Sequence, residues 1–301
     1  MNTSSVTVID TDETFNIDNP QGYYTLLQQR QKIDLYETIN GAEYQMATHY
    51  IKTWETTSGV ISTFSCQDIL GVMDGTSFRG GVYDVMPAGE IIDEIMTSLG
   101  WTDYYVDPEI VEMTLSGIIK PCSHRAALQQ VLFAFGVCAA TDGGETIRIF
   151  SPGGTPESIG AGRTYTGASV DTSAVVTAVR VTAHTYTKSS DGSIEIGGER
   201  YRDTETVYTV ENPDVTSNTK TNVVEITGAT LVSAANGQAV AQRVYNYYAK
   251  RDAARAKIVW RGEKLGDAVT LPNPWGGTNT GNIVRMDLTL SNTVAADCEV
   301  V

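Results

Sequence analysis

Apolar and polar residues alternate along much of this chain with the period of a half-buried strand. Between residues 32 and 64 the alternation falls into three runs, separated by Asn40-Gly41 and Ser58-Gly59. Asn-Gly and related pairs form the tight turns that join antiparallel strands. The pattern therefore predicts an antiparallel meander, followed by a short helical turn within residues 66–73 that closes one end of the sheet.

A different period, that of a helix, begins after Pro87. Proline suits the first turn of a helix, and Gly100 follows the last periodic residue, as glycine does at many helix ends. The apolar residues of this stretch share one face: Ile91, Ile92, Ile95, Met96 and Leu99. Burying such side chains contributes about 1.5–3 kcal/mol each, before their ordering entropy is subtracted. The predicted helix must therefore pack against another apolar surface.

The stretch from Ser123 to Phe150 predicts that partner helix and a hairpin after it. Ser123 is a favourable N-cap and Gly136 a favourable stop. Between them one face is apolar, at Leu128, Val131, Leu132 and Phe135. Asp142-Gly143-Gly144 favours a turn with positive φ between strands expected at residues 137–140 and 145–150. The unit has the features of a scaffold and contains no catalytic pattern.

Strand signals return beyond residue 173. Residues 174–187 and 201–210 are predicted to form a long hairpin through Asp191-Gly192. Further strands are expected at 256–260, 265–272 and 283–290, the last with Val284, Met286, Leu288 and Leu290 on one face. A third amphipathic helix is predicted over 234–250, with one side formed by Ala235, Ala239, Val240, Val244, Tyr247 and Tyr248.

Two segments have the composition of connections. Residues 1–20 are polar and acidic, which predicts an arm or an edge strand that orders against a partner. Residues 151–170 are rich in Gly, Pro and Ser, which predicts a domain boundary or a long crossing loop. A length of 301 residues favours two or three domains, and 15 Tyr and 28 Gly beside many Val and Thr favour a β-rich fold.

Composition and charge exclude several classes of function. The chain is 41% hydrophobic and 19% charged, as a folded globular protein is. Its formal net charge of −15 repels polyanions, so adhesive binding of nucleic acid is not expected. No apolar run approaches the roughly 20 residues of a membrane helix, and the N-terminus lacks the basic and apolar regions of an export signal. We therefore expect a soluble protein without a membrane anchor.

The residues that usually carry chemistry are few and scattered. Four cysteines lie far apart in the sequence, without zinc-ligand spacing, and are expected to be reduced and buried: Cys66, Cys122, Cys138 and Cys298. Each of the three histidines is expected to be structural: His49, His124 and His184. Asp10, Asp12 and Glu13 lack the glycine and distant glutamate of a calcium loop. We predict no enzyme, and no catalytic, cofactor-binding or metal-binding residue.

Aromatic residues leave one alternative open. Trp275 lies in a Pro/Gly-rich loop, LPNPWGG, that favours exposure of its ring, and stacking of sugars on such rings is common. With Tyr247 and Tyr248 it would make a carbohydrate-binding surface adhesin. Core packing is the expectation for Trp54 and Trp260. A glycosidase built on two acidic residues is a third option, because such pairs need no fixed spacing.

Several of these segments, in their order, resemble a known family. The arrangement GVMDGTSFRGGVYD, then PAGEIIDEIMTSLGW, then the stretch from Ser123 to Phe150, is similar to the tail-hub proteins of bacteriophages, including the tail-associated and late-control-D-like families. TAVRVTAHTYT resembles a strand that re-enters the second barrel of such hubs. NGQAVAQRVYNYYAKRDAARAKIVWRGEKLGDAVTLP resembles their helix, strand and turn before the final strands. The likeness covers roughly residues 32–290.

The resemblance implies an α+β, β-rich fold with two antiparallel, tube-type β-barrel domains and small helix-strand α/β elements between them. The expected divisions are an acidic arm (1–20), a first barrel or meander (21–85), an α/β element (86–150), a linker (151–170) and a second barrel part with one long helix (171–301). No lytic motif follows residue 290, so an attached hydrolase is not expected.

The function that the resemblance implies is structural. The protein is expected in the virion, at the tail tip, after synthesis in the bacterial cytoplasm. There it forms a trimeric hub ring, with the tail tube, distal tail, tape-measure and tail fibre proteins as partners. DNA passes through the ring without adhering.

Overall fold

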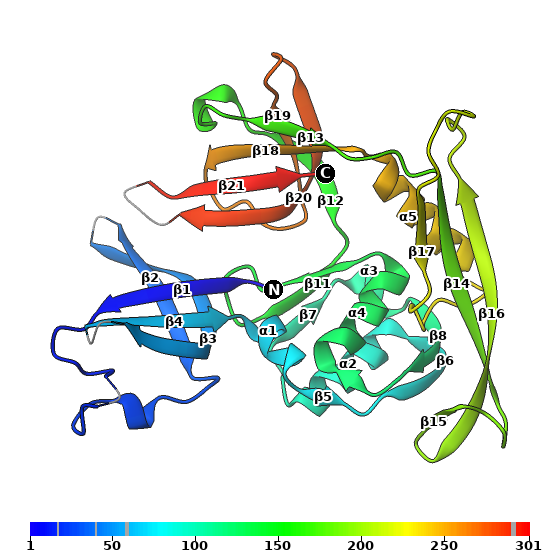
Figure 1. Ribbon diagram of the computed structural model, residues 1–301, viewed down its shortest axis with the longest axis horizontal. Coiled ribbons are helices and arrows are strands. Elements are labelled where there is room, and N and C mark those ends of the chain that lie inside the picture. Colours follow the sequence, from blue (N-terminus) through cyan, green and yellow to red (C-terminus); the bar gives the residue numbers. More distant parts are fainter. Residues whose placement is uncertain (17, 40, 58–59, 290–292) are drawn as a thin grey trace.

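The computed structural model describes residues 1–16, 18–39, 41–57, 60–289 and 293–301. Several small sheets surround a central unit of helices and short strands (Figure 1). A four-stranded sheet lies on one side of this unit, a long hairpin lies on the opposite side, and a curled six-stranded sheet stands above it in the view shown. The β-rich α+β class predicted from the sequence is confirmed.

The first sheet contains the predicted meander. Its strands are β1 (Thr3–Ile9), β2 (Lys32–Ile39), β3 (Ala42–Thr57) and β4 (Ile61–Gln67), in the order β1-β4-β3-β2, and all pairs are antiparallel. The turn residues Asn40, Ser58 and Gly59 lie outside the described residues. Residues 1–20 begin with the edge strand β1, so this segment is ordered against β4 of its own chain rather than against a partner.

The first sheet is open rather than closed into a barrel. β1 and β2 form its two edges, with β4 and β3 between them. Its core is small: Ile51, Phe64 and Cys66 are buried, and Phe15 from the loop after β1 packs edge-on against Phe64 at 5.3 Å between ring centroids. The same loop contains the short helix η1 (Tyr24–Leu26), whose Tyr24 ring packs edge-on against Trp54 of β3 at 6.3 Å between ring centroids. The described residues therefore form the meander of the predicted barrel or meander part, and they do not show a barrel here.

The central unit spans residues 69–150. Its elements are α1 (Ile69–Asp74), β5 (Ser77–Phe78), β6 (Gly81–Pro87), α2 (Ala88–Leu99), β7 (Tyr104–Val106), α3 (Pro108–Val111), β8 (Thr114–Ile119), β9 (Cys122–Ser123), α4 (His124–Phe135), β10 (Cys138–Ala140) and β11 (Ile147–Phe150). β10, β11 and β7 form one sheet, and β5–β9 and β6–β8 are two-stranded pairs. The short predicted helical turn is α1.

Both long helices of the unit end at the predicted glycines, and α4 begins at the predicted cap. The Ser123 Oγ accepts a hydrogen bond from the Ala126 N–H at 3.2 Å, and Gly136 ends α4 with φ of 75°. Gly100 ends α2 in the same left-handed conformation, while Pro87 precedes the helix instead of lying in its first turn. Ile91, Ile92 and Ile95 of α2 are fully buried in one cluster with α4. The predicted packing of the two helices is confirmed.

The hairpin after α4 is also as predicted. β10 and β11 pair antiparallel, and the turn residues Asp142 and Gly143 have φ of 43° and 84°. β11 additionally pairs in parallel with β7, a contact between strands more than 40 residues apart that no local pattern indicates.

The predicted linker, residues 151–170, contains regular structure. It includes β12 (Gly153–Ser158), η2 (Ala161–Arg163) and the beginning of β13 (Ser169–Thr172). β12 pairs in parallel with β19 and β13 pairs antiparallel with β18, at the two edges of the six-stranded sheet. All six side chains of β12 are exposed, so neither face of this strand needs apolar residues and its sequence need not alternate between polar and apolar. This is why the Gly/Pro/Ser composition did not reveal the strands.

The six-stranded sheet curls into a half-barrel (Figure 1). Its other strands are β18 (Asp252–Val259), β19 (Asp267–Pro272), β20 (Thr278–Thr289) and β21 (Ala295–Val300), in the order β12-β19-β20-β21-β18-β13. The concave face is apolar, whereas the outer face carries cross-strand ion pairs, such as Arg255–Glu299 at 3.1 Å and Lys257–Asp297 at 3.6 Å. This alternation is what a half-buried strand requires.

The strand near residue 283 departs from its predicted face. A register shift between Ile283 and Arg285 places Ile283 and Met286 in the core and leaves Val284 and Leu288 partly exposed. A bulge of this kind adds one residue to the strand and reverses the alternation locally. Leu290 lies outside the described residues.

The long hairpin forms a separate layer instead of part of a second barrel. β14 (Ala178–Lys188) pairs with β16 (Glu199–Glu211), and β15 (Ile194–Ile196) and β17 (Val223–Ile226) extend the sheet. α5 (Gly237–Ala249) packs on it through Val240, Ala241 and Val244. The predicted helical stripe is correct at Val240 and Val244, but Tyr247 and Tyr248 are on the exposed side.

Candidate assembly edges

The sheets of this protein have open edges that differ in how they are protected. An edge strand presents unpaired N–H and C=O groups to any neighbouring chain. Natural proteins block such pairing with charged residues, proline or very short strands. Each edge can therefore be assessed from the residues that it carries.

Most edges here have one of these protections. β2 carries Lys32, Asp34 and Glu37, and β12 carries Pro156 and Glu157. The others have a single acid or are short: Asp171 in β13, Glu225 in β17, Glu195 in β15, and three residues each in β7 and β10. These strands are poor templates for pairing with another chain.

Among the described edges longer than three residues, only β1 and β8 carry neither charge nor proline, and β8 is mostly buried whereas β1 is not. The seven residues of β1, TSSVTVI, contain no charge, no proline and three β-branched apolar residues. β4 lies on one side of it only, and Ile9 at its end is 75% exposed. Such a strand is suited to accept an added strand by backbone hydrogen bonding. The sequence indicated an edge here, but its lack of protection is clear only once the other edges are known.

The exposed aromatic residues do not form one platform. Trp275 is 76% exposed in the turn between β19 and β20, as predicted for a loop residue. Tyr247 and Tyr248 lie at the end of α5, where their rings meet edge-to-face at 5.3 Å. Trp54 and Trp260 pack against the cores of their sheets, as expected. No contact joins Trp275 to the tyrosine pair among the described residues.

Each predicted structural histidine is buried and hydrogen-bonded. His49 of β3 lies 2.6 Å from Ser4 Oγ, and burial lowers its pKa. His124 lies between Thr76 and Ser98, at 2.9 Å from each hydroxyl, and burial lowers its pKa as well. His184 of β14 lies 2.8 Å from an Asp203 carboxylate oxygen. The sequence did not indicate this last pair, because the two residues meet only through the register of the hairpin.

The cysteines and the acidic cluster have structural environments. Cys66 and Cys298 are buried as expected, whereas Cys122 is half-buried and Cys138 is exposed. Burial raises the pKa of the Cys66, Cys122 and Cys298 thiols, that of Cys298 to about 12, so thiolate chemistry of these three at neutral pH is disfavoured. The Asp10 carboxylate accepts hydrogen bonds from the Phe15 and Thr14 N–H groups, which lower its pKa. It holds the loop after β1 in place.

The described residues line two surface hollows of about 610 and 600 Å³. The first is lined by Lys250, Arg251 and Asp252 beside β20 and β21, and the second by α2 residues that include Glu90 and Glu94. Neither contains a histidine or a cysteine. Among the residues that the structure describes, no helix combines the length and apolar character needed to cross a membrane.

No protein-family model and no curated protein matches the chain. Solved structures do match, and the chain has the fold of bacteriophage and prophage tail proteins. The 43 kDa tail protein of prophage MuSo2 from Shewanella oneidensis superposes with a TM-score of 0.61 at 13% identity, over 99% of this chain and 89% of that one.

Two further structures have the same arrangement. A tail protein from Neisseria meningitidis MC58 matches with a TM-score of 0.59 at 11% identity, over 85% of this chain and 80% of that one. A chain of the virion of a native gene transfer agent particle matches with a TM-score of 0.51 at 18% identity, over 72% of this chain and 48% of its own length. Identities this low establish the fold, and function requires its own argument.

Proposed function

We propose that this protein is a structural component of the tail tip of a phage or phage-derived particle, where it forms a trimeric hub ring. The ring joins the tail tube to distal tail, tape-measure and fibre proteins, and no catalytic turnover is involved. The observation that carries the proposal is the match of nearly the whole chain to a phage tail protein fold. The unprotected β1 edge supports it, because it fits a role in which sheets are completed by neighbouring chains.

A ring made of copies of one chain needs a head-to-tail contact between two different surfaces. β1 is suited to be one of them, because strand addition uses main-chain hydrogen bonds and needs little side-chain complementarity. The other described edge strands are charged, contain proline, are very short or are mostly buried, so they are poor templates for pairing among themselves. In this proposal β1 of one copy therefore pairs with an element of the next copy around the ring.

The charge of the chain fits a passage for DNA. The net charge is −15, and many of its cations are already paired with acids on the sheet surfaces. Binding of DNA releases counterions only where cationic side chains face the phosphates. A lumen of this composition lets the duplex move without adhering. A solved assembly with a lumen rich in Lys and Arg would contradict this part of the proposal.

The first prediction concerns the β1 edge. The double variant Ser5→Lys, Thr7→Lys is expected to shift the protein from a trimer toward the 32.5 kDa monomer. The two lysines place charge on β1, and pairing with a neighbouring chain would have to remove water from these charges. Sedimentation equilibrium over a range of concentrations measures this shift. Ser65→Lys is the matched control, since Ser65 faces Ser5 across the sheet but lies on the central strand β4. Equal association of both variants, or a wild-type monomer at all concentrations, contradicts the proposal.

A carbohydrate-binding adhesin is the second candidate, and the exposure of Trp275 is the observation that favours it. If it is correct, Trp275→Ala removes binding of the protein to a glycan array, and the wild-type chain is a monomer. The hub proposal predicts instead that Trp275→Ala leaves the oligomeric state unchanged and that no glycan is retained by either protein. The two experiments together separate the two functions.

A further inference from the structure

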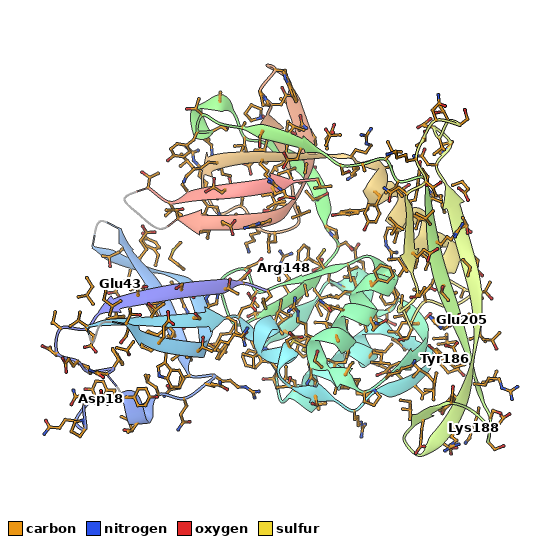
Figure 2. The ribbon with its side chains drawn as sticks, viewed as in Figure 1. Asp18, Glu43, Arg148, Tyr186, Lys188 and Glu205 are labelled. Carbon is orange, nitrogen blue, oxygen red and sulfur yellow. The ribbon has the colours of Figure 1, made fainter. Side chains whose placement is uncertain are left out.

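The middle of the long hairpin brings four functional side chains to one face. His184 and Tyr186 lie on β14, opposite Glu205 and Asp203 of β16, respectively. Residues paired directly across two strands, and those two positions along a strand, point to the same side of a sheet. Figure 2 shows Tyr186 and Glu205 on this part of the hairpin, with Lys188 nearer to its tip.

The hydrogen bonds of His184 fix the orientation of its ring. The ring is only 5% exposed, and Nε2 lies 3.1 Å from the carbonyl oxygen of Thr227. A carbonyl oxygen only accepts, so Nε2 carries the proton of this bond. The Nδ1 then faces Asp203, with 2.8 Å to its Oδ2. This orientation, with one ring nitrogen anchored to a backbone carbonyl, is the one that metal-bound histidines commonly have.

Polar atoms on this face of the hairpin lack hydrogen-bond partners within the described part of the chain, and one of them is an oxygen of the Asp203 carboxylate. One ligand atom each from His184, Asp203 and Glu205 lies within 4.8 Å of the other two. Asp203 Oδ1 and the Tyr186 hydroxyl are buried, and neither has a hydrogen-bond partner among the described residues. Burying polar atoms without partners is unfavourable, so these atoms indicate a missing cation or donor.

Nearby basic side chains do not supply that cation. Lys188 forms an ion pair with Glu199 at 2.7 Å, Arg202 with Asp191 at 2.6 Å and Arg180 with Glu225 at 3.2 Å. These ion pairs therefore leave the carboxylates of Asp203 and Glu205 without a basic side chain of their own in the part of the chain that the structure describes. A divalent ion would satisfy both carboxylates and the imidazole at once.

We propose that His184, Asp203 and Glu205 bind a divalent transition-metal ion of the Zn²⁺ class. Imidazole and carboxylate are ligands that Zn²⁺ accepts at about 2.0–2.2 Å, whereas Ca²⁺ and Mg²⁺ prefer oxygen alone. Glu205 is exposed, so rotation of its side chain brings the three ligand atoms to these distances. Thr227 orients the histidine from the opposite side of the ring. The ion would tie β14 to β16 and leave at least one coordination position for water.

The test is a titration of tag-free, full-length protein with Zn²⁺ by isothermal calorimetry. Cys138→Ser serves as the background for all samples, because that exposed thiol is a competing ligand. One site per chain is expected. Glu205→Gln is expected to weaken binding about tenfold or more, as loss of a metal-site contact generally does. Glu211→Gln, on the same strand and the same face six residues away, is the matched control and is expected to bind as the background does.

A spectroscopic measurement identifies the ligands. Co²⁺ bound by imidazole and carboxylates gives visible absorption bands without thiolate charge transfer, and Glu205→Gln is expected to weaken them. Asp203→Asn serves as a second variant with the same expected result. Absence of Zn²⁺ binding by the background protein overturns the proposal. So does equal binding by Glu205→Gln and Glu211→Gln, or a cobalt spectrum dominated by thiolate.

Discussion

Replacing Ile95 by alanine is expected to lower the free energy of unfolding of the central unit by about 2–5 kcal/mol. The Ile95 side chain is completely buried, and it belongs to the cluster that joins α2 to α4. Truncating it removes apolar contacts and leaves a cavity, because the surrounding helices relax only partly. Urea unfolding, with hydrogen exchange of the peptides from α2 and α4 as the local readout, measures the loss.

The control for this variant lies on the same helix. Thr97 is exposed two residues further along α2, so Thr97→Ala is expected to change stability by no more than about 0.5 kcal/mol. The local readout matters because the chain has several separate cores, which need not unfold together. A similar small effect of both substitutions would mean that α2 does not depend on α4 for its stability.

The central unit was predictable from sequence because its information is local. The spacing of apolar residues in α2 and α4 and the caps at Ser123, Gly100 and Gly136 act within one or two turns of the chain. The turn at Asp142-Gly143 is equally local, since it depends on which residues tolerate positive φ. Each of these features depends on residues that are close together in the sequence, so it can be predicted before the fold is known.

Most individual strands were predictable from the sequence, but which strands pair to form each sheet was not. β12 pairs with β19 across more than a hundred residues, and nothing in its Gly/Pro-rich sequence specifies that partner. The division of the second β region into a half-barrel and a hairpin layer depends on where α5 packs. The likeness to tail hubs predicted two barrels, whereas the described residues form an open sheet and one half-barrel.

The importance of the β1 edge and of the cluster on the β14–β16 hairpin likewise depends on pairing that the sequence does not reveal. β1 was predictable as an edge, but its importance comes from comparison with charged edges elsewhere in the fold. The residues His184, Asp203 and Glu205 were individually unremarkable in sequence, and the register of β14 and β16 brings them together. A one-residue slip of that register would place the acids on the other face.

The buried ion pair of the half-barrel leads to the second large expected effect. Arg163, in η2 of the segment predicted to be a linker, donates to the Glu263 carboxylate and, through the same Nη2, to the Val259 carbonyl at 3.0 Å. The other Glu263 oxygen accepts from the Arg261 N–H at 2.7 Å. The Glu263 side chain is 4% exposed and that of Arg163 13% exposed. The pair fixes η2 against the end of β18.

Glu263→Ala is expected to destabilise the half-barrel by about 3–5 kcal/mol, because it removes the only buried carboxylate among the described residues that pairs with Arg163 and leaves this guanidinium with the exposed Glu157 and a backbone carbonyl. Glu157 provides the matched control. It pairs with the same arginine at 3.1 Å, but its side chain is 63% exposed. Exposed pairs contribute at most about 1 kcal/mol, so Glu157→Ala is expected to have a small effect. Urea unfolding of both variants at pH 7 measures the difference. Similar losses of unfolding free energy in the two variants would contradict the expectation that the buried Glu263 contributes more than the exposed Glu157.

Acid should reveal the same pair. Burial alone raises the pKa of Glu263, but hydrogen bonds from the Arg261 N–H and from Arg163 outweigh it, so the pKa lies below its ordinary value of 4.5. A carboxyl with a lowered folded-state pKa contributes stability that is complete above its unfolded pKa and is lost as the pH falls through the folded one. The half-barrel of the wild-type protein is therefore expected to weaken below about pH 4.5. Glu263→Gln cannot ionise, so its half-barrel should lose less stability between pH 7 and pH 3 than that of the wild-type protein. Hydrogen exchange of β18 measures this loss. The same loss in both proteins would show that other carboxylates cause the acid sensitivity.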